Sequence, residues 1–263
     1  MTAYGERISV KTRREIERMR EAARHVAEIL LELRELAKPG VTTAELNAAA
    51  ERSIARRGVV SSFKGYGPHG LPQYPASVCI SVNEEIVHGI PGPRELRDGD
   101  LLSLDFGVSV DGWHGDSAVT VPIGEVGGLA RDLMDTTRAA LYCGIEQVRE
   151  GNRISDIGHA VQQRAEKAGY SVVRQFVGHG IGRKLHEPPQ IPNFGEPGRG
   201  ARMRVGMVFA IEPMVCAGSA EVRMLEDEWT AVTADGSLAA HFEHTVLVTE
   251  QGPEILTRIE GSH

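Results

Sequence analysis

Residues 101–121 read LLSLDFGVSVDGWHGDSAVTV, two apolar runs that are separated by Asp111-Gly112. An Asp-Gly pair between apolar runs is a strong signal for a two-residue β-hairpin turn. If the residues that flank the turn pair with each other, Gly107 lies opposite Asp116, and Asp105 shares the face of Gly107. The hairpin therefore predicts that Asp105 and Asp116 are diagonal neighbours, with roughly 7–8 Å between their backbones. A turn shifted by one residue would place the two carboxylates on opposite faces.

Three further metal-binding side chains lie in apolar or glycine-rich sequence. Glu212 follows the apolar run 208–211 and precedes a proline that ends strand pairing. Glu243 lies within the strand-like run 239–248, AAHFEHTVLV, and His179 lies in the glycine-rich turn GHGIG. Four buried carboxylates would repel one another unless a cation lay between them. The sequence therefore predicts a metal site, and hence a hydrolase, built from Asp105, Asp116, His179, Glu212 and Glu243.

The helical pattern occurs twice along the chain. Capping boxes and apolar periodicity predict helices over residues 12–37, 42–58, 128–149 and 155–169, the last capped by Ser155. Helix-ending glycines of the first pair recur 111 positions later, at Gly151 and Gly169. We expect one closed α+β domain over residues 1–263, with similar halves at about 8–122 and 127–255. Apolar strands would form its central sheet, with the long helices packed on one side.

Composition narrows the classes of function. The 263 residues carry a formal charge of −7, which argues against a nucleic-acid-binding role. No apolar run approaches the roughly 18 residues of a membrane span. The start of the chain lacks an apolar core behind basic residues, so no signal peptide is expected. Three sparse cysteines, Cys79, Cys143 and Cys216, indicate free thiols in a reducing cytoplasm.

Six motifs, taken in order, resemble those of methionine aminopeptidases of type I, within the pita-bread metallopeptidase family. They are SVCISVNEEIVHGIP at 77–91, LDF at 104–106, GDS at 115–117, GHGIGRKLHE at 178–187, IEPM at 211–214 and FEHT at 242–245. The resemblance spans residues 8–255. Type II members carry a helical insertion between the histidine ligand and the next glutamate, whereas His179 and Glu212 are only 33 positions apart here. The resemblance is to the short bacterial form.

The resemblance implies the pita-bread fold, with pseudo-two-fold halves around a central antiparallel sheet. It also implies two divalent metal ions. Asp105 would chelate one ion, Asp116 and Glu243 would bridge the pair, and His179 and Glu212 would bind the other. Such a donor set suits Mn²⁺, Fe²⁺ or Co²⁺ and tolerates Zn²⁺.

Roles for other side chains follow from the same resemblance. Glu212 is also the candidate proton shuttle. His186 would hydrogen-bond the scissile carbonyl oxygen, and His88 would contact the peptide nitrogen or leaving amine. The methionine pocket would be lined by Cys79, Tyr74, Trp229 and Phe63. Phe63 stands where many bacterial members have cysteine, and the segment 65–74 is longer than the family's usual loop.

The resemblance implies a cytoplasmic, monomeric exopeptidase. It would remove the initiator methionine from nascent chains whose second residue is small, with transient ribosome association and no direct nucleic-acid or membrane function. Two alternatives remain. Xaa-Pro aminopeptidases share the fold but usually carry an N-terminal domain and further histidines. Non-catalytic scaffolds of this fold bind protein or RNA and typically lose metal ligands. The creatine-type hydrolases share the fold but do not keep this set of metal ligands either.

Overall fold

Residues 7–67 and 72–258 are described by a computed structural model. Residues 68–71, within the segment expected to be a long loop, lie outside the described residues, as do 1–6 and 259–263. The helices are α1 (Arg13–Leu36), α2 (Thr43–Arg57), α3 (Gly128–Ile145) and α4 (Ile154–Lys167). The strands are β1 (Val60–Ser61), β2 (Cys79–Val82), β3 (Glu85–Val87), β4 (Leu101–Val110), β5 (Trp113–Pro122), β6 (Ser171–Val172), β7 (Gly178–Gly180), β8 (Glu187–Ile191), β9 (Val208–Ile211), β10 (Met214–Cys216), β11 (Val222–Met224), β12 (Ala231–Thr233), β13 (Ala239–His241), β14 (His244–Thr249) and β15 (Gly252–Ile255).

The first two helices begin where the capping boxes predict. The N–H of Thr12 donates to the Glu15 carboxylate at 2.8 Å, and the N–H of Thr42 donates to Glu45 at 2.8 Å. Each bond satisfies one of the N–H groups that a helix start leaves without an intrahelical partner. Helix α2 is capped at Gly58, whose φ of 65° is the left-handed conformation that glycine adopts at little cost.

The second helix pair departs from prediction at two boundaries. Helix α3 ends at Ile145, and the expected continuation to residue 149 is wrong. Beyond Ile145 the backbone forms a tighter turn, in which the N–H of Val148 donates to the carbonyl of Ile145, three residues earlier, at 2.9 Å. Ser155 is not the cap of α4, because the helix is capped at Arg153, whose N–H donates to Asp156 at 2.7 Å.

The hairpin of β4 and β5 has the predicted register. Val110 pairs with Trp113, and Gly107 pairs with Asp116. Both residues of the Asp111-Gly112 turn have positive φ, 51° and 74°, as the common two-residue hairpin turn requires. The two carboxylates at positions 105 and 116 therefore share one face of the hairpin.

The strands form four antiparallel groups. Strand β4 lies between β1 and β2 and also pairs with β5, while a five-stranded group has the order β15-β14-β9-β7-β8. The groups meet where the N–H of Glu243 donates to the carbonyl of Ala118 on β5 at 2.9 Å. This crossing bond interrupts the run 239–248, which was expected to be one strand and instead divides into β13 and β14.

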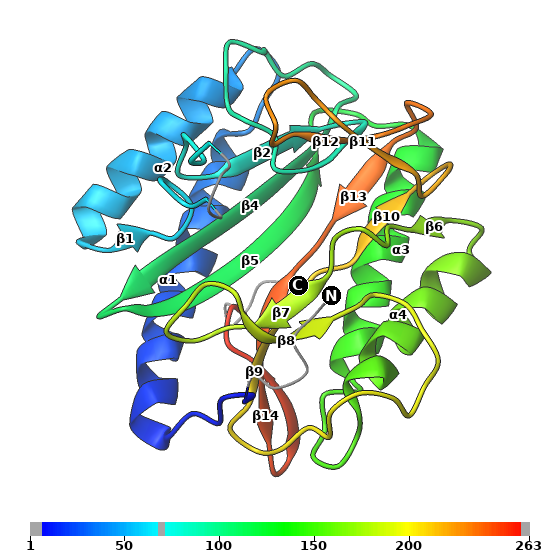
Figure 1. The fold of residues 1–263 in the computed structure, drawn as a ribbon. Coiled ribbons are helices and arrows are strands. Elements are labelled where there is room, and N and C mark those ends of the chain that lie inside the picture. Colours follow the sequence, from blue (N-terminus) through cyan, green and yellow to red (C-terminus); the bar gives the residue numbers. More distant parts are fainter. Residues whose placement is uncertain (1–6, 68–71, 259–263) are drawn as a thin grey trace.

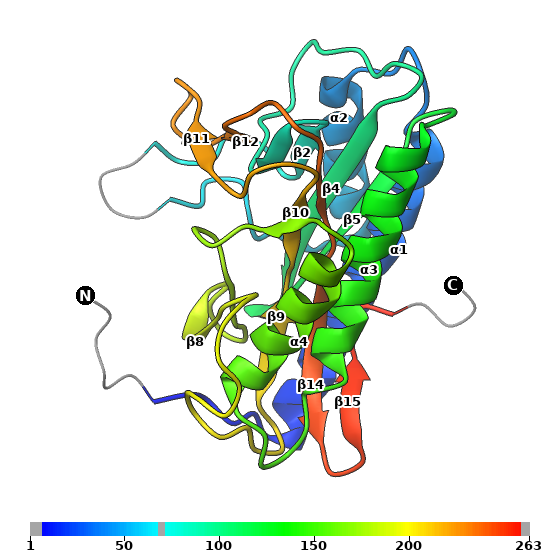
Figure 2. The ribbon, with the colours of Figure 1, turned by 90° about the vertical axis from the view of Figure 1, so that its right-hand side faces the viewer.

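Helices cover one side of the strands. Figure 1 shows β4 and β5 running side by side through the molecule, with α1 behind them. Figure 2 shows α1, α2 and α3 on one side of the strands and β8 on the other. Among the described residues, 7–67 and 72–258, no helix combines the length and apolarity needed to cross a bilayer.

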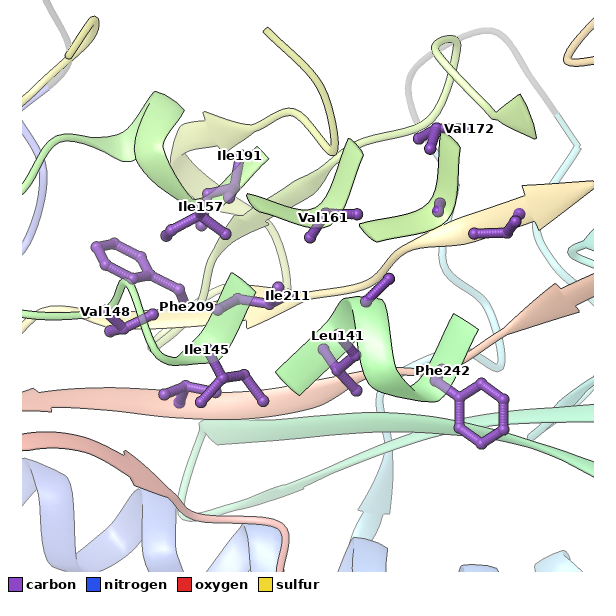
Figure 3. Packing of buried hydrophobic residues seen from close by; sticks show 14 of the residues in the cluster. Leu141, Ile145, Val148, Ile157, Val161, Val172, Ile191, Phe209, Ile211 and Phe242 are labelled. Atoms are coloured by element: carbon purple, nitrogen blue, oxygen red, sulfur yellow. The ribbon is translucent and has the colours of Figure 1, made fainter. Parts of the chain in front are cut away.

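Each helix pair packs on its own apolar cluster. Helices α1 and α2 bury Leu30, Leu33 and Leu46 against β2 and β4. Helices α3 and α4 bury residues that include Leu141 and Val161 against β9 and β10, and Figure 3 shows this cluster at close range. The two cores hold the strands firmly, so side chains on the opposite strand faces are placed with little freedom.

Candidate metal centre

The five predicted metal ligands line one cavity of about 210 Å³. The chain supplies them from separate places: β4, β5, β7, the end of β9, and the junction of β13 with β14. We call them the ligand cluster, which consists of Asp105, Asp116, His179, Glu212 and Glu243. Residues that are up to 138 positions apart in the sequence are thereby brought together.

The tightest part of the ligand cluster is a group of three. One donor atom each from Asp116, His179 and Glu243 lies within 4.8 Å of the other two, and all three residues are buried. Glu212 adjoins them, because its Oε1 lies 3.4 Å from Nε2 of His179. Asp105 completes the ligand cluster from the register position diagonal to Asp116.

Glycines bring the histidine strand close to its neighbours. The segment around His179 was expected to be a turn, but it forms β7, which pairs with β8 and β9. A Cβ at Gly178 would overlap the carbonyl oxygen of Ala210, and one at Gly180 would overlap that of Pro188. The glycines thus permit close strand approach and hold the imidazole in the sheet.

Three carboxylate oxygens of the ligand cluster are buried without a hydrogen-bond partner in the described part of the chain: Asp105 Oδ1, Asp116 Oδ1 and Glu243 Oε1. Leaving a buried polar atom unsatisfied costs about 1–3 kcal/mol, and more for a charged group. Three such atoms directed at one place fit a bound cation, which would satisfy them together. The donor set of carboxylate oxygens and one imidazole also fits a first-row divalent ion.

The carboxylates resist ionisation in the absence of a cation. Burial raises the pKa of Asp116 to about 7. Burial, followed by repulsion from neighbouring carboxylates, raises the pKa of Asp105, Glu212 and Glu243 well above the usual range. A divalent ion reverses this effect, because it favours the charged form of every ligand.

His179 is prepared as a neutral ligand. Burial, with a smaller effect of His186, lowers its pKa to about 3, so the imidazole is uncharged at neutral pH. Its Nδ1 lies 2.9 Å from the carbonyl oxygen of Gly180, so Nδ1 carries the proton and donates it. The lone pair is then on Nε2, the nitrogen that is available to a metal ion.

Two more imidazoles line the cavity. His88 has a φ of 61°, and its ring contacts Phe176 and Trp229 edge-on. The ring centroid of His186 lies 4.2 Å from that of His179. Burial lowers the pKa of both His88 and His186 to about 4, so each is neutral and can donate one hydrogen bond.

The remainder of the cavity wall is mostly apolar or aromatic. All four predicted pocket residues line it, namely Phe63, Tyr74, Cys79 and Trp229. Five further residues of this wall were not predicted from the sequence: Tyr66, Val87, Phe176, Val177 and Met214. Phe176, Val177 and Met214 lie within three positions of a metal ligand in the sequence, and this proximity could have indicated them. Tyr66 had no such signal, because it is remote in sequence from every metal ligand.

His241 was also missed. It is 1% exposed, and neither ring nitrogen has a hydrogen-bond partner among the described residues. Its Nε2 lies 3.9 Å from Oε2 of Glu212, whereas His179 approaches the other oxygen, Oε1. Strand alternation places residues 241 and 243 on one face, so the pattern could have indicated this histidine.

Comparisons with known proteins agree with this geometry. A model of metallopeptidase family M24 matches residues 17–250. Methionine aminopeptidase 1 of Bacillus subtilis is 50% identical over 252 residues, which cover 96% of this chain and 100% of that protein. The methionine aminopeptidase of Clostridium perfringens is also 50% identical, over 254 residues with the same coverage.

Solved structures give the same picture. The methionine aminopeptidase of Thermotoga maritima matches with a TM-score of 0.93 at 44% identity, covering 96% of this chain and 100% of that one. An Xaa-Pro dipeptidase from Bacillus anthracis matches with a TM-score of 0.77 at 20% identity, covering 96% of this chain and 63% of that one. The second likeness shows the fold alone. Together the matches confirm the predicted α+β pita-bread fold.

Proposed function

This chain belongs to metallopeptidase family M24, and we propose that it removes the initiator methionine from nascent proteins whose second residue is small. Relatives named methionine aminopeptidase match it over nearly its full length. The observation that carries the proposal is the meeting of the ligand cluster, two neutral histidines and an apolar wall in one cavity.

The enzyme depends on divalent metal, which the family and the buried donor group both support. We propose that the site takes two ions: Asp105 would hold one, His179 and Glu212 would hold the other, and Asp116 and Glu243 would be shared between them. The donors suit Mn²⁺, Fe²⁺ or Co²⁺ and admit Zn²⁺. When bound, such ions activate water and stabilise the negative charge that develops on the scissile carbonyl.

Side chains around the ions carry the proton transfers. Glu212 accepts a proton from the attacking water and delivers it to the departing amine. Burial keeps His186 neutral, so it donates its single N–H to the carbonyl oxygen as charge develops there. His88, which lines the same cavity, contacts the peptide nitrogen or the leaving amine. Both histidines serve the transition state and do not hold the ion.

The apolar wall selects methionine. Cys79, Tyr74, Trp229 and Phe63 offer one sulfur and three aromatic rings, surfaces that suit a flexible thioether. Tyr74 is fixed from behind, because its hydroxyl donates to the carbonyl of Gly89 at 2.8 Å. This bond fixes the position of the Tyr74 ring in the pocket wall.

We propose that the chain is one catalytic domain, residues 1–263, with related halves at about 8–122 and 127–255. Its two helix pairs, each packed on its own core, support this division. We further propose that it acts as a monomer in the cytoplasm on emerging chain ends, with transient ribosome association. No direct nucleic-acid role is proposed.

The test is hydrolysis of three peptides by the purified protein, with chelator or with added Mn²⁺ or Co²⁺. Met-Ala-Ser should be cleaved in a metal-dependent way, and Met-Leu-Ser far more slowly. Preferential cleavage of an Ala-Pro peptide would favour the Xaa-Pro reading. Absence of turnover under every metal condition would favour a non-catalytic scaffold.

A further inference from the structure

Tyr66 reaches the histidine at the mouth of the cavity. Its hydroxyl lies 2.6 Å from Nδ1 of His186, and the two ring centroids are 5.1 Å apart. Both residues line the cavity that holds the ligand cluster. We propose that Tyr66 is a positioning residue that holds His186 in the tautomer with its proton on Nε2. The inference deepens the proposed function and rests on it, because that tautomer presents a donor to the scissile carbonyl.

The tautomer decides what the neutral form of His186 presents to the cavity. A neutral imidazole has one N–H and one lone pair, so it donates from Nε2 only if Nδ1 is unprotonated. A histidine with its proton on Nδ1 would turn a lone pair toward the cavity and repel a carbonyl oxygen.

The chemistry of the pair decides which partner donates. Burial raises the pKa of Tyr66, so the phenol keeps its proton at neutral pH. A phenol O–H is a stronger acid than a neutral imidazole N–H, and an imidazole nitrogen is a better acceptor than a phenol oxygen. The favoured bond therefore runs from the Tyr66 hydroxyl to Nδ1, which leaves the proton of His186 on Nε2.

Hydrogen bonds to Glu187 fix the backbone next to His186, but they do not involve the His186 ring. The Glu187 carboxylate accepts from Ser9 Oγ at 2.6 Å, Lys11 Nζ at 3.0 Å and the N–H of Arg183 at 2.7 Å. Within residues 7–67 and 72–258, the hydrogen-bond partner of the His186 ring is Tyr66. The backbone is thus fixed by one set of contacts and the proton position by another.

Nitrogen NMR of metal-free protein labelled with ¹⁵N-histidine tests the tautomer directly, with His186→Gln used to assign the resonances. Wild type should show a protonated Nε2 and a lone-pair Nδ1 at His186. Tyr66→Phe should shift the two resonances toward averaged values. The control Tyr142→Phe removes the hydroxyl of a 40% exposed tyrosine on α3, outside the cavity, and should leave them unchanged. A protonated Nδ1 in wild type, or an unchanged tautomer in Tyr66→Phe, would overturn the proposal.

Kinetics on Met-Ala-Ser supply the second readout. A neutral hydrogen bond shifts a two-state equilibrium by a factor of about 3 to 10, and averaged tautomers leave about half of the molecules with the proton on Nε2. Tyr66→Phe should therefore lower kcat roughly twofold. KM and the Mn²⁺ affinity measured by calorimetry should stay near wild type. In the His186→Gln background the same change should have no further effect. If Tyr66→Phe lowered kcat equally in the His186→Gln background, or changed KM alone, action through His186 would be contradicted.

The proposed function and this inference can be refuted independently. If the protein cleaves no methionyl peptide, the proposed function is wrong, and the NMR experiment still decides whether Tyr66 sets the tautomer. If it cleaves Met-Ala-Ser but the tautomer does not respond to Tyr66→Phe, the proposed function stands and this inference is wrong.

Discussion

Removing the charge of Asp116 should stabilise the metal-free protein at alkaline pH. Burial raises the pKa of this carboxyl from 3.8 to about 7, so the folded state holds a proton that the unfolded chain releases. Because the folded-state pKa of this acid is raised, the protein is most stable below pH 3.8. Its stability then falls as the pH rises to about 7. At about 1.4 kcal/mol per pH unit, the loss is about 1.6 kcal/mol at pH 5 and about 4 kcal/mol at pH 8.

Asp116→Asn cannot ionise and escapes this loss. Urea unfolding in chelator, followed by circular dichroism, should show the variant gaining about 2.5 kcal/mol on wild type between pH 5 and pH 8. Mn²⁺ at 100 times its Kd should stabilise wild type by about 2.7 kcal/mol and the variant far less. Asp111→Asn, at the exposed turn of the same hairpin, is the matched control and should respond to Mn²⁺ as wild type does. An equal stability difference at both pH values would refute the reasoning.

Three further outcomes are expected. Glu212→Gln should lower kcat on Met-Ala-Ser by about 10²–10⁴-fold with an unchanged circular dichroism spectrum, and near-normal turnover would exclude it as proton shuttle. His186→Ala should lower kcat by about 10²–10³-fold while mass spectrometry finds wild-type metal content, and a parallel loss of metal would make it a ligand. Gly180→Ala should lower the free energy of unfolding by about 1–3 kcal/mol, since a Cβ there overlaps the carbonyl of Pro188. Gly127→Ala, where a Cβ meets open space, is its control, and equal effects in urea would refute the steric argument.

Local patterns predicted the parts of the fold that depend on neighbours in sequence. The Asp111-Gly112 turn determined the register of β4 and β5, and that register placed Asp105 and Asp116 on one face. The boxes at Thr12 and Thr42 predicted two helix starts correctly. Ser155 failed as a cap because the helix begins earlier, with the Asp156 carboxylate accepting from the N–H of the cap residue Arg153.

Features that depend on distant contacts were not predictable in the same way. The segment around His179 looked like a glycine turn, and only its packing against β8 and β9 makes it a strand. The break before His244 arises from a bond between Glu243 and Ala118, which is remote in sequence. Tyr66 reaches His186 across 120 positions, a contact that no local pattern encodes.

Anomalous diffraction from crystals soaked in Mn²⁺ tests the metal centre most directly. Two peaks should lie among the carboxylates, one near Asp105 and one near His179 and Glu212, with Asp116 and Glu243 between them. Peaks at other sites only, or empty carboxylates in a soaked crystal of active enzyme, would contradict the account.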